Sequence, residues 1–132
     1  MPEGALPDYI RKFIREHISS VEQLEILLHL FRISPRMEPS EAVAQTLYLS
    51  PESTERQLQR FSEKGLIAMQ RGTPTTFGIA DRFTSLGVQI EGLSKCYRER
   101  RVSVINEIFS NPISTLQSFA DAFIISKKKE GQ

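Results

Sequence analysis

The segment Ser50–Leu66, with the sequence S-P-E-S-T-E-R-Q-L-Q-R-F-S-E-K-G-L, carries both a start signal and a stop signal for one helix. Its first residue is a favourable N-cap, and Pro51 suits the first helical position, where a backbone N–H would have no partner within the helix. Leu58 and Phe61 share one helical face, and Gly65 suits the left-handed conformation that ends many helices. The segment therefore predicts a helix of about four turns with one buried stripe.

Helical spacing also marks the segments that precede this one. Across residues 7–18, apolar side chains recur at steps of three and four, which predicts an amphipathic leading helix. The sequence S-V-E-Q from Ser20 is a capping box, and leucines at helical spacing follow it. Ser40 caps a short third helix after the break S-P-R-M-E-P, and Leu49 begins the turn into the fourth.

An extended pattern replaces the helical one after the glycine. Residues 66–70 and 76–80 are short β-rich runs separated by R-G-T-P-T, which predicts a hairpin. The helical period returns over residues 82–109 and predicts one helix about 40 Å long at 1.5 Å per residue. A last helix, begun by Asn111-Pro112, extends to about residue 125. The sequence thus predicts a mainly α-helical fold with a small β-hairpin, built as a single domain over residues 1–132.

Composition restricts the environment in which this chain works. Seventeen Lys and Arg against sixteen Asp and Glu give a formal charge of +1, so no global field draws the protein toward polyanions or membranes. Cys96 is the only cysteine and cannot form an internal disulfide, which is compatible with a reducing compartment. The first residues lack the basic start and apolar run of a signal peptide, and no stretch approaches the roughly 20 apolar residues of a membrane span. We expect a cytoplasmic protein that does not enter a membrane.

The sequence lacks the motifs of catalysis and of metal binding. It contains no glycine-rich phosphate loop, no nucleophile elbow and no close pair of acids in a recognisable motif. His17 and His29 lie in different predicted helices without ligands at metal-site spacing around them. The basic stretch 95–101 favours a solvated helix face. We therefore expect no enzymatic activity, no catalytic or metal-binding residue and no cofactor.

Three helices followed by a hairpin, with L-x-x-F-x-x-x-G-L at the junction, resemble a winged helix-turn-helix domain. The junction motif consists of Leu58, Phe61, Gly65 and Leu66, and the resemblance covers roughly residues 20–80. A leading helix and long C-terminal helices resemble bacterial regulators of the MarR and PadR type, in which flanking helices form a dimer. The phrase F-A-D-A-F at 119–123 is similar to part of short uncharacterised bacterial proteins of this kind. The resemblance implies a DNA-binding transcriptional regulator of the bacterial cytoplasm.

In winged-helix regulators, the second helix of the motif enters the major groove, and the wing contacts the DNA backbone or minor groove. Carried over to this chain, the resemblance implies six contacts with double-stranded DNA, from Ser53, Thr54, Arg56, Gln59 and Arg60 in the helix and from Arg71 in the wing. Their guanidinium, amide and hydroxyl groups are chemically suited to bases and phosphates.

The charges of Ser50–Leu66 cancel, however, because three acidic residues balance three basic ones: Glu52, Glu55 and Glu63, and Arg56, Arg60 and Lys64. Phosphate neutralisation supplies much of the affinity for DNA, and a neutral helix supplies little of it. An alternative therefore stays open, in which the same fold is an interaction module that binds a protein partner and not DNA.

A second apolar stripe follows the predicted helix 82–109. Its members are spaced by 4, 3, 4, 7 and 4 residues, close to the period of a helix–helix seam; they are Leu86, Ile90, Leu93, Tyr97, Val104 and Ile108. Pairing of two copies along this stripe predicts the symmetric homodimer that a palindromic operator requires. Packing of the stripe against its own domain is the alternative. A further face of Val102, Ile105 and Phe109 indicates that this helix has more than one neighbour.

Overall fold

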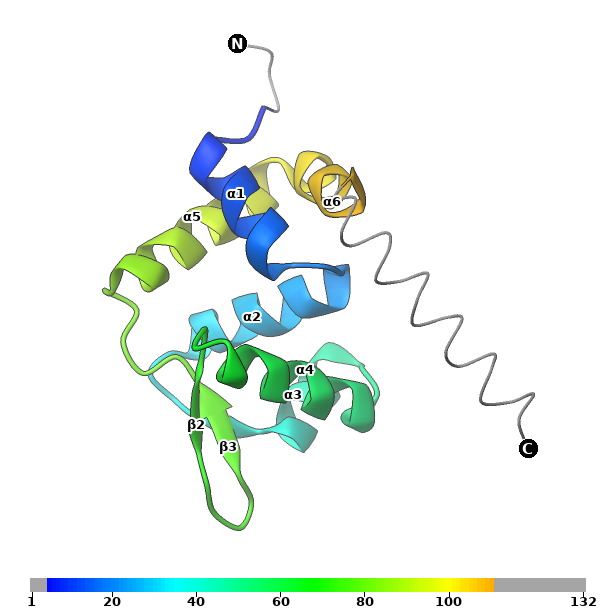
Figure 1. Cartoon of the computed structure of the whole chain (residues 1–132). Helices are drawn as coiled ribbons and strands as arrows, with labels where there is room; N and C mark the ends of the chain where they lie inside the picture. The colour runs from blue at the N-terminus through cyan, green and yellow to red at the C-terminus, as the bar shows by residue number, and fades with distance from the viewer. Residues whose placement is uncertain (1–4, 111–132) are drawn as a thin grey trace, which may run out of the picture. The chain divides into compact units, whose positions relative to one another are not determined.

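The computed structural model describes residues 5–110, and within them the chain is mainly helical with a small three-stranded antiparallel sheet (Figure 1). This confirms the predicted fold class at that level. The described residues cluster into two compact units. The central unit is Glu22–Lys95, and the terminal unit combines the described residues up to Val21 with those from Cys96 onward. The elements in chain order are α1 (Asp8–His17), α2 (Val21–Ile33), β1 (Glu38–Pro39), α3 (Ser40–Leu47), α4 (Pro51–Glu63), β2 (Ala68–Gln70), β3 (Thr76–Gly78), α5 (Ser85–Glu99) and α6 (Arg101–Ser110).

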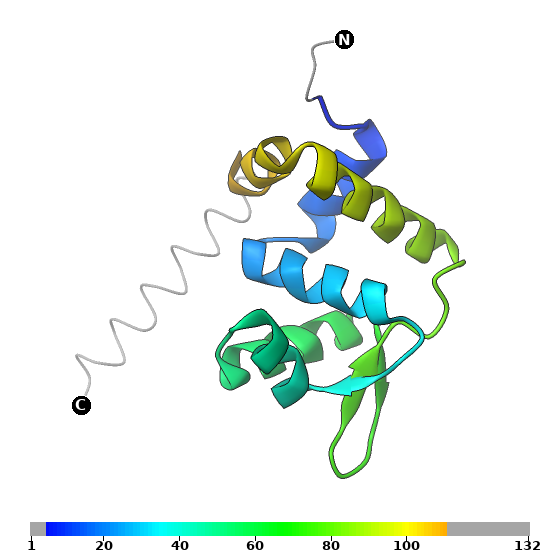
Figure 2. The same ribbon diagram turned by 180° about the vertical axis from the view of Figure 1, so that it is seen from behind.

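Helix α2 supplies much of the core of the central unit. An unbroken run from Ile26 to Phe31 is buried, so this helix is covered on nearly every side. A helix that is apolar around most of its circumference is expected to be surrounded by other elements. Helices α3 and α4 pack on each other and lie together along α2 (Figure 2). The predicted buried stripe of α4 is confirmed, since Leu58 and Phe61 are both buried.

The sheet has the strand order β1-β3-β2, with both pairs antiparallel. The predicted hairpin is confirmed as β2 and β3, in which Met69 lies opposite Phe77. Strand β1 was not predicted, because S-P-R-M-E-P contains two prolines and was interpreted only as a helix break. Proline is tolerated in a short edge strand, where its missing N–H interrupts no inner ladder. Glu38 lies opposite Phe77 on the other side of β3, so this segment is tied to the hairpin.

The terminal unit is organised by contact between α1 and α6. Helix α1 agrees with the predicted leading helix and buries Ile10, Phe13 and Ile14, at the spacing of one face. Glu107 of α6 accepts from Arg11 and also lies within ion-pair distance of Arg15. The two helices are therefore joined by both apolar and charged groups.

The prediction of one continuous helix over residues 82–109 is wrong. The chain forms α5 and α6 with a break at Arg100, although the Arg100 N–H still donates to the carbonyl of Cys96. Residues 98–102 are all exposed, and four of these five are charged. No buried side chain in this stretch holds the two helices to a common axis, which gives a physical reason for the break.

The predicted dimer seam is also contradicted, because its side chains are used within the single chain. Leu86 is partly buried, whereas the five other members are buried: Ile90, Leu93, Tyr97, Val104 and Ile108. Packing of this stripe against its own chain is therefore the correct alternative.

The predicted last helix and the phrase at 119–123 lie outside the described residues. Among the helices that the structure describes, none combines the length and the apolar character needed to cross a bilayer.

Candidate nucleic-acid interface

Helix α4 begins and ends as its sequence predicts. The Ser50 hydroxyl accepts from the Ser53 N–H at 3.4 Å, and Pro51 occupies the first turn. At the other end, Gly65 has φ of 78°, its N–H donates to the Ser62 carbonyl, and the next residue donates to the carbonyl of Phe61. These two bonds form a Schellman motif, which satisfies carbonyls that the helix itself leaves open. The caps thus fix the bounds of α4 at both ends.

Two exposed arginines lie on the outer surface of α4. Glu52, Arg56 and Arg60 follow each other at steps of four residues and are all exposed, on the side opposite Leu58 and Phe61. Within the described part of the chain, neither guanidinium group has an ion-pair partner. Both are therefore available to an anionic or polar partner.

Two other predicted contacts of α4 already have partners in the chain. Ser53 donates through its hydroxyl to Oε1 of Glu22 at 2.6 Å. Gln59 donates through Nε2 to Oε1 of Glu55 at 3.3 Å, one turn earlier in the same helix. A nucleic acid would have to displace or share these hydrogen bonds. Among the predicted contacts of α4, the side chains of Arg56 and Arg60 are therefore less engaged within the chain than those of Ser53 and Gln59.

The assignment of Thr54 to this surface is wrong. Its exposed fraction is 0%, and its Oγ1 has no hydrogen-bond partner among the described residues. Thr54, Leu58 and Phe61 follow the helical steps of four and three, so they share the inner face. The hydroxyl suggested a phosphate contact, but the spacing in the sequence already placed it in the core.

The hairpin carries the remaining predicted contact. Residues 70–74, which include Arg71 and the turn, are all exposed, and the β2–β3 loop projects beyond α3 and α4 (Figures 1 and 2). Arg71 has no ion-pair partner among the described residues. The central unit therefore presents three unpaired arginines on α4 and on the hairpin.

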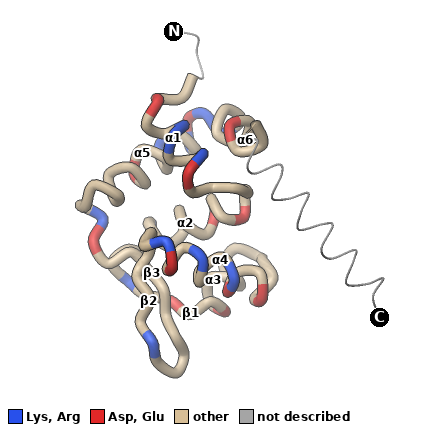
Figure 3. The backbone as a smooth tube through the Cα atoms, in the orientation of Figure 1, with Lys and Arg blue, Asp and Glu red and all other residues tan. Residues whose placement is uncertain are grey.

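Acidic side chains share this surface with the basic ones. Figure 3 shows basic and acidic positions side by side along α4, in agreement with the balance of three against three in the sequence. Glu55 is half-buried and bonded to Gln59, which leaves Glu52 as the exposed acid nearest the start of the helix. The surface is polar and locally mixed in sign.

One exposed residue beside α4 was missed by the sequence analysis. Tyr48 ends α3 and lies in the three-residue turn that leads to α4. Its exposed fraction is 95%, and its backbone is left-handed, with φ of 58° and ψ of 45°. Neither property could be read from the sequence, in which a tyrosine between two leucines indicates a core position.

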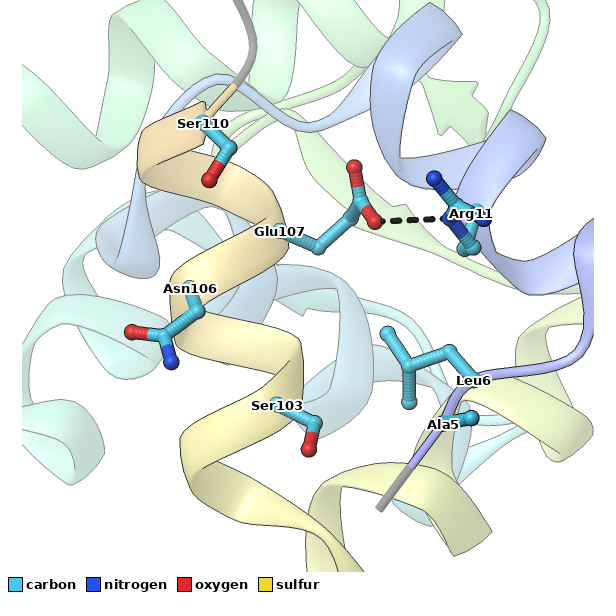
Figure 4. Close-up of a pocket in the computed structure, with 7 residues that line it drawn as sticks. All are labelled: Ala5, Leu6, Arg11, Ser103, Asn106, Glu107 and Ser110. Carbon is cyan, nitrogen blue, oxygen red and sulfur yellow. Dashed lines mark hydrogen bonds and ion pairs between the residues drawn. The ribbon is translucent and has the colours of Figure 1, made fainter. Parts of the chain in front are cut away.

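The terminal unit contains an open cleft of about 310 Å³ between α1 and α6 (Figure 4). Ser103, Asn106 and Ser110 line it with polar groups, and Arg11 faces Glu107 across it at 2.9 Å. The opposite charges of this pair compensate each other. None of the residues predicted to bind DNA lies in this cleft. Nowhere in residues 5–110 do three metal-ligating side chains gather into one group.

Comparison of the chain with protein-family models, with curated proteins and with solved structures finds no match. Inference about function therefore starts from the geometry of α4, the turn before it and the hairpin after it.

Proposed function

We propose that this protein is a winged helix-turn-helix regulator that binds double-stranded DNA. Helices α3 and α4 are joined by a turn of three residues, and the β2–β3 hairpin follows α4 directly. In this architecture, α4 would enter the major groove, and the hairpin would act as the wing. The observation that carries the proposal is the set of three exposed and unpaired arginines, Arg56, Arg60 and Arg71, on these two elements.

The three arginines supply the chemistry of recognition. Arg56 and Arg60 are one turn apart, so both can reach the same groove, where a guanidinium group binds guanine or phosphate with two hydrogen bonds. Arg71 would neutralise a phosphate or enter the minor groove. Three phosphate contacts per chain correspond to a slope of about −2.7 in a plot of log affinity against log salt. We therefore expect binding that is weak and sensitive to salt.

Protein binding is the second candidate function, and it is favoured by the cancelling charges of α4. Ser53 and Gln59 are also engaged within the chain, which reduces the number of free groups for bases. In this alternative, the exposed surface of α4 would bind a protein partner through the same arginines.

Titration of a mixture of genomic DNA fragments, followed by fluorescence anisotropy at several salt concentrations, tests the proposal. Arg56→Gln and Arg60→Gln should each weaken binding and reduce the salt slope by about 1. Arg98→Gln is the matched control, because this exposed arginine lies at the end of α5, outside the proposed surface. No binding by the wild-type protein at low salt would overturn the DNA proposal and favour the protein-binding alternative.

The proposal includes a homodimer in the bacterial cytoplasm, since a palindromic site is read by two symmetry-related copies. The buried residues of the first predicted seam cannot provide this contact. Val102 and Phe109 of α6 are exposed apolar side chains and would provide it in their place.

A further inference from the structure

Tyr48 combines two properties that are individually uncommon. Its side chain is almost fully exposed, and its backbone lies in the left-handed region, at φ of 58°. Among the described residues other than glycine, it is the only one with positive φ. This conformation is unfavourable for a bulky side chain, and glycine or asparagine would adopt it more readily.

The folded chain gains little from the phenol ring in return. The ring buries almost no surface, and the hydroxyl has no hydrogen-bond partner among the described residues. The left-handed backbone ends α3, because the Tyr48 N–H donates to the Gln45 carbonyl and the Leu49 N–H donates to the Ala44 carbonyl. A glycine would end the helix in the same way without a steric cost, so the exposed tyrosine side chain indicates a function outside the fold.

The position of Tyr48 indicates what it contacts. It lies two residues before the N-cap of α4, at the end of the helix that would enter DNA first. Glu52, the first exposed charged residue of α4, is acidic and repels phosphate, whereas a phenol is a neutral donor. Tyrosine hydroxyls are among the groups that hold DNA backbone phosphates and fix the register of a protein on the duplex.

We propose that the Tyr48 hydroxyl donates a hydrogen bond to a DNA backbone phosphate at the edge of the groove that receives α4. This inference rests on the proposed function. It adds a positioning contact that carries no charge, next to an acidic first turn. The contact would contribute affinity at every salt concentration, because no counterion is released when a neutral group binds phosphate.

The test compares Tyr48→Phe with Arg56→Gln on the same DNA fragments over a range of salt. Tyr48→Phe keeps the ring and the backbone conformation but removes the hydroxyl, so we expect a loss of affinity of about tenfold with an unchanged salt slope. Arg56→Gln should instead reduce the slope by about 1. Tyr9→Phe, which alters an exposed tyrosine of α1, is the matched control and should bind as the wild type does.

Tyr48→Gly adds a second readout. It should raise the thermal midpoint, because glycine adopts positive φ without a steric cost, and it should weaken DNA binding at least as much as Tyr48→Phe. Wild-type binding that neither variant at Tyr48 weakens would overturn this inference and leave the proposed function intact. A lower midpoint for Tyr48→Gly would also overturn it, since the ring would then stabilise the fold. Failure of the wild type to bind would overturn both.

Discussion

Some features of α4 and of the turn before it were predicted from the sequence, and others were not. The cap at Ser50, the end at Gly65 and the inner positions Leu58 and Phe61 follow from local rules and are all found. Thr54 was assigned to the DNA-binding surface because of its hydroxyl group, although its helical spacing from Leu58 places it on the inner face. The left-handed conformation of Tyr48 ends α3 through backbone hydrogen bonds, but this position holds neither the glycine nor the asparagine that would signal such an end in the sequence.

Thr54 also gives a test of stability. Its hydroxyl is buried without a hydrogen-bond partner among the described residues, and such a group costs about 1–3 kcal/mol. Thr54→Val removes the hydroxyl with almost no change of shape, so the free energy of unfolding should rise by about 1 kcal/mol in urea denaturation. Thr46→Val, at an exposed position of α3, should stay within about 0.5 kcal/mol of wild type. A loss of stability in Thr54→Val would mean that the hydroxyl is satisfied.

At Gly87 the helix α5 lies close to the backbone of Arg82, a contact that the sequence does not indicate. A Cβ atom there would overlap the carbonyl oxygen of Arg82 and lie 2.9 Å from its Cα. Although alanine is favoured over glycine inside a helix by about 1 kcal/mol, Gly87→Ala should lower stability by about 1–3 kcal/mol. Gly72→Ala, whose Cβ would make an ordinary contact at 3.4 Å, should have little effect. Equal unfolding midpoints for both variants would contradict the predicted overlap.

At the scale of elements, helices with an apolar face and a clear boundary at each end were predicted well, whereas the longest periodic segment and the connection at residues 34–39 were not. The helices over residues 8–17 and 51–63 are close to the predicted ranges, since each has an apolar face and a clear boundary. Strand β1 was missed because two residues cannot show a period. The break at Arg100 was missed because the seven-residue step from Tyr97 to Val104 is compatible with one helix as well as with two.

The contact between α1 and α6 can be tested through its ion pairs. Glu107 is 13% exposed and accepts from Arg11 at 2.9 Å, with Arg15 at 3.4 Å. Glu107→Gln should lower the free energy of unfolding by about 1 kcal/mol, and high salt should narrow the difference from wild type, since both arginines are partly solvated. Glu16→Gln removes an exposed carboxylate of α1 and should change stability by less than about 0.5 kcal/mol. If the loss of unfolding free energy in Glu107→Gln did not depend on salt, the role of Glu107 would be in packing and not in the ion pairs.

For the whole molecule, the predominance of helices followed from hydrophobic periodicity and capping residues, and the hairpin followed from two β-rich runs around a turn. The sequence did not predict what covers the apolar stripe from Leu86 to Ile108. Periodicity identifies a buried face but does not identify the surface that packs on it. A stripe of period 3.5 serves a second copy and the same chain equally well. In the structure, the stripe is buried by the same chain, and the proposed homodimer has to use other side chains.

Substitutions on the exposed and on the buried face of α6 should affect that dimer in different ways. Val102 and Phe109 are 71% and 66% exposed, whereas Ile108 is fully buried. Light scattering should give about twice the chain mass of 15.0 kDa for the wild type. The double substitution Val102→Ser with Phe109→Ser should halve that value, and each chain should stay folded, because surface changes cost little.

Ile108→Ser is the matched change on the buried face of the same helix. It should lower the free energy of unfolding by about 2–5 kcal/mol, since it removes buried methyl groups and introduces a hydroxyl into the core. A monomeric mass for the wild type at all concentrations would contradict the homodimer. A dimer that survives the double substitution would show that the two copies meet on a surface other than the exposed face of α6.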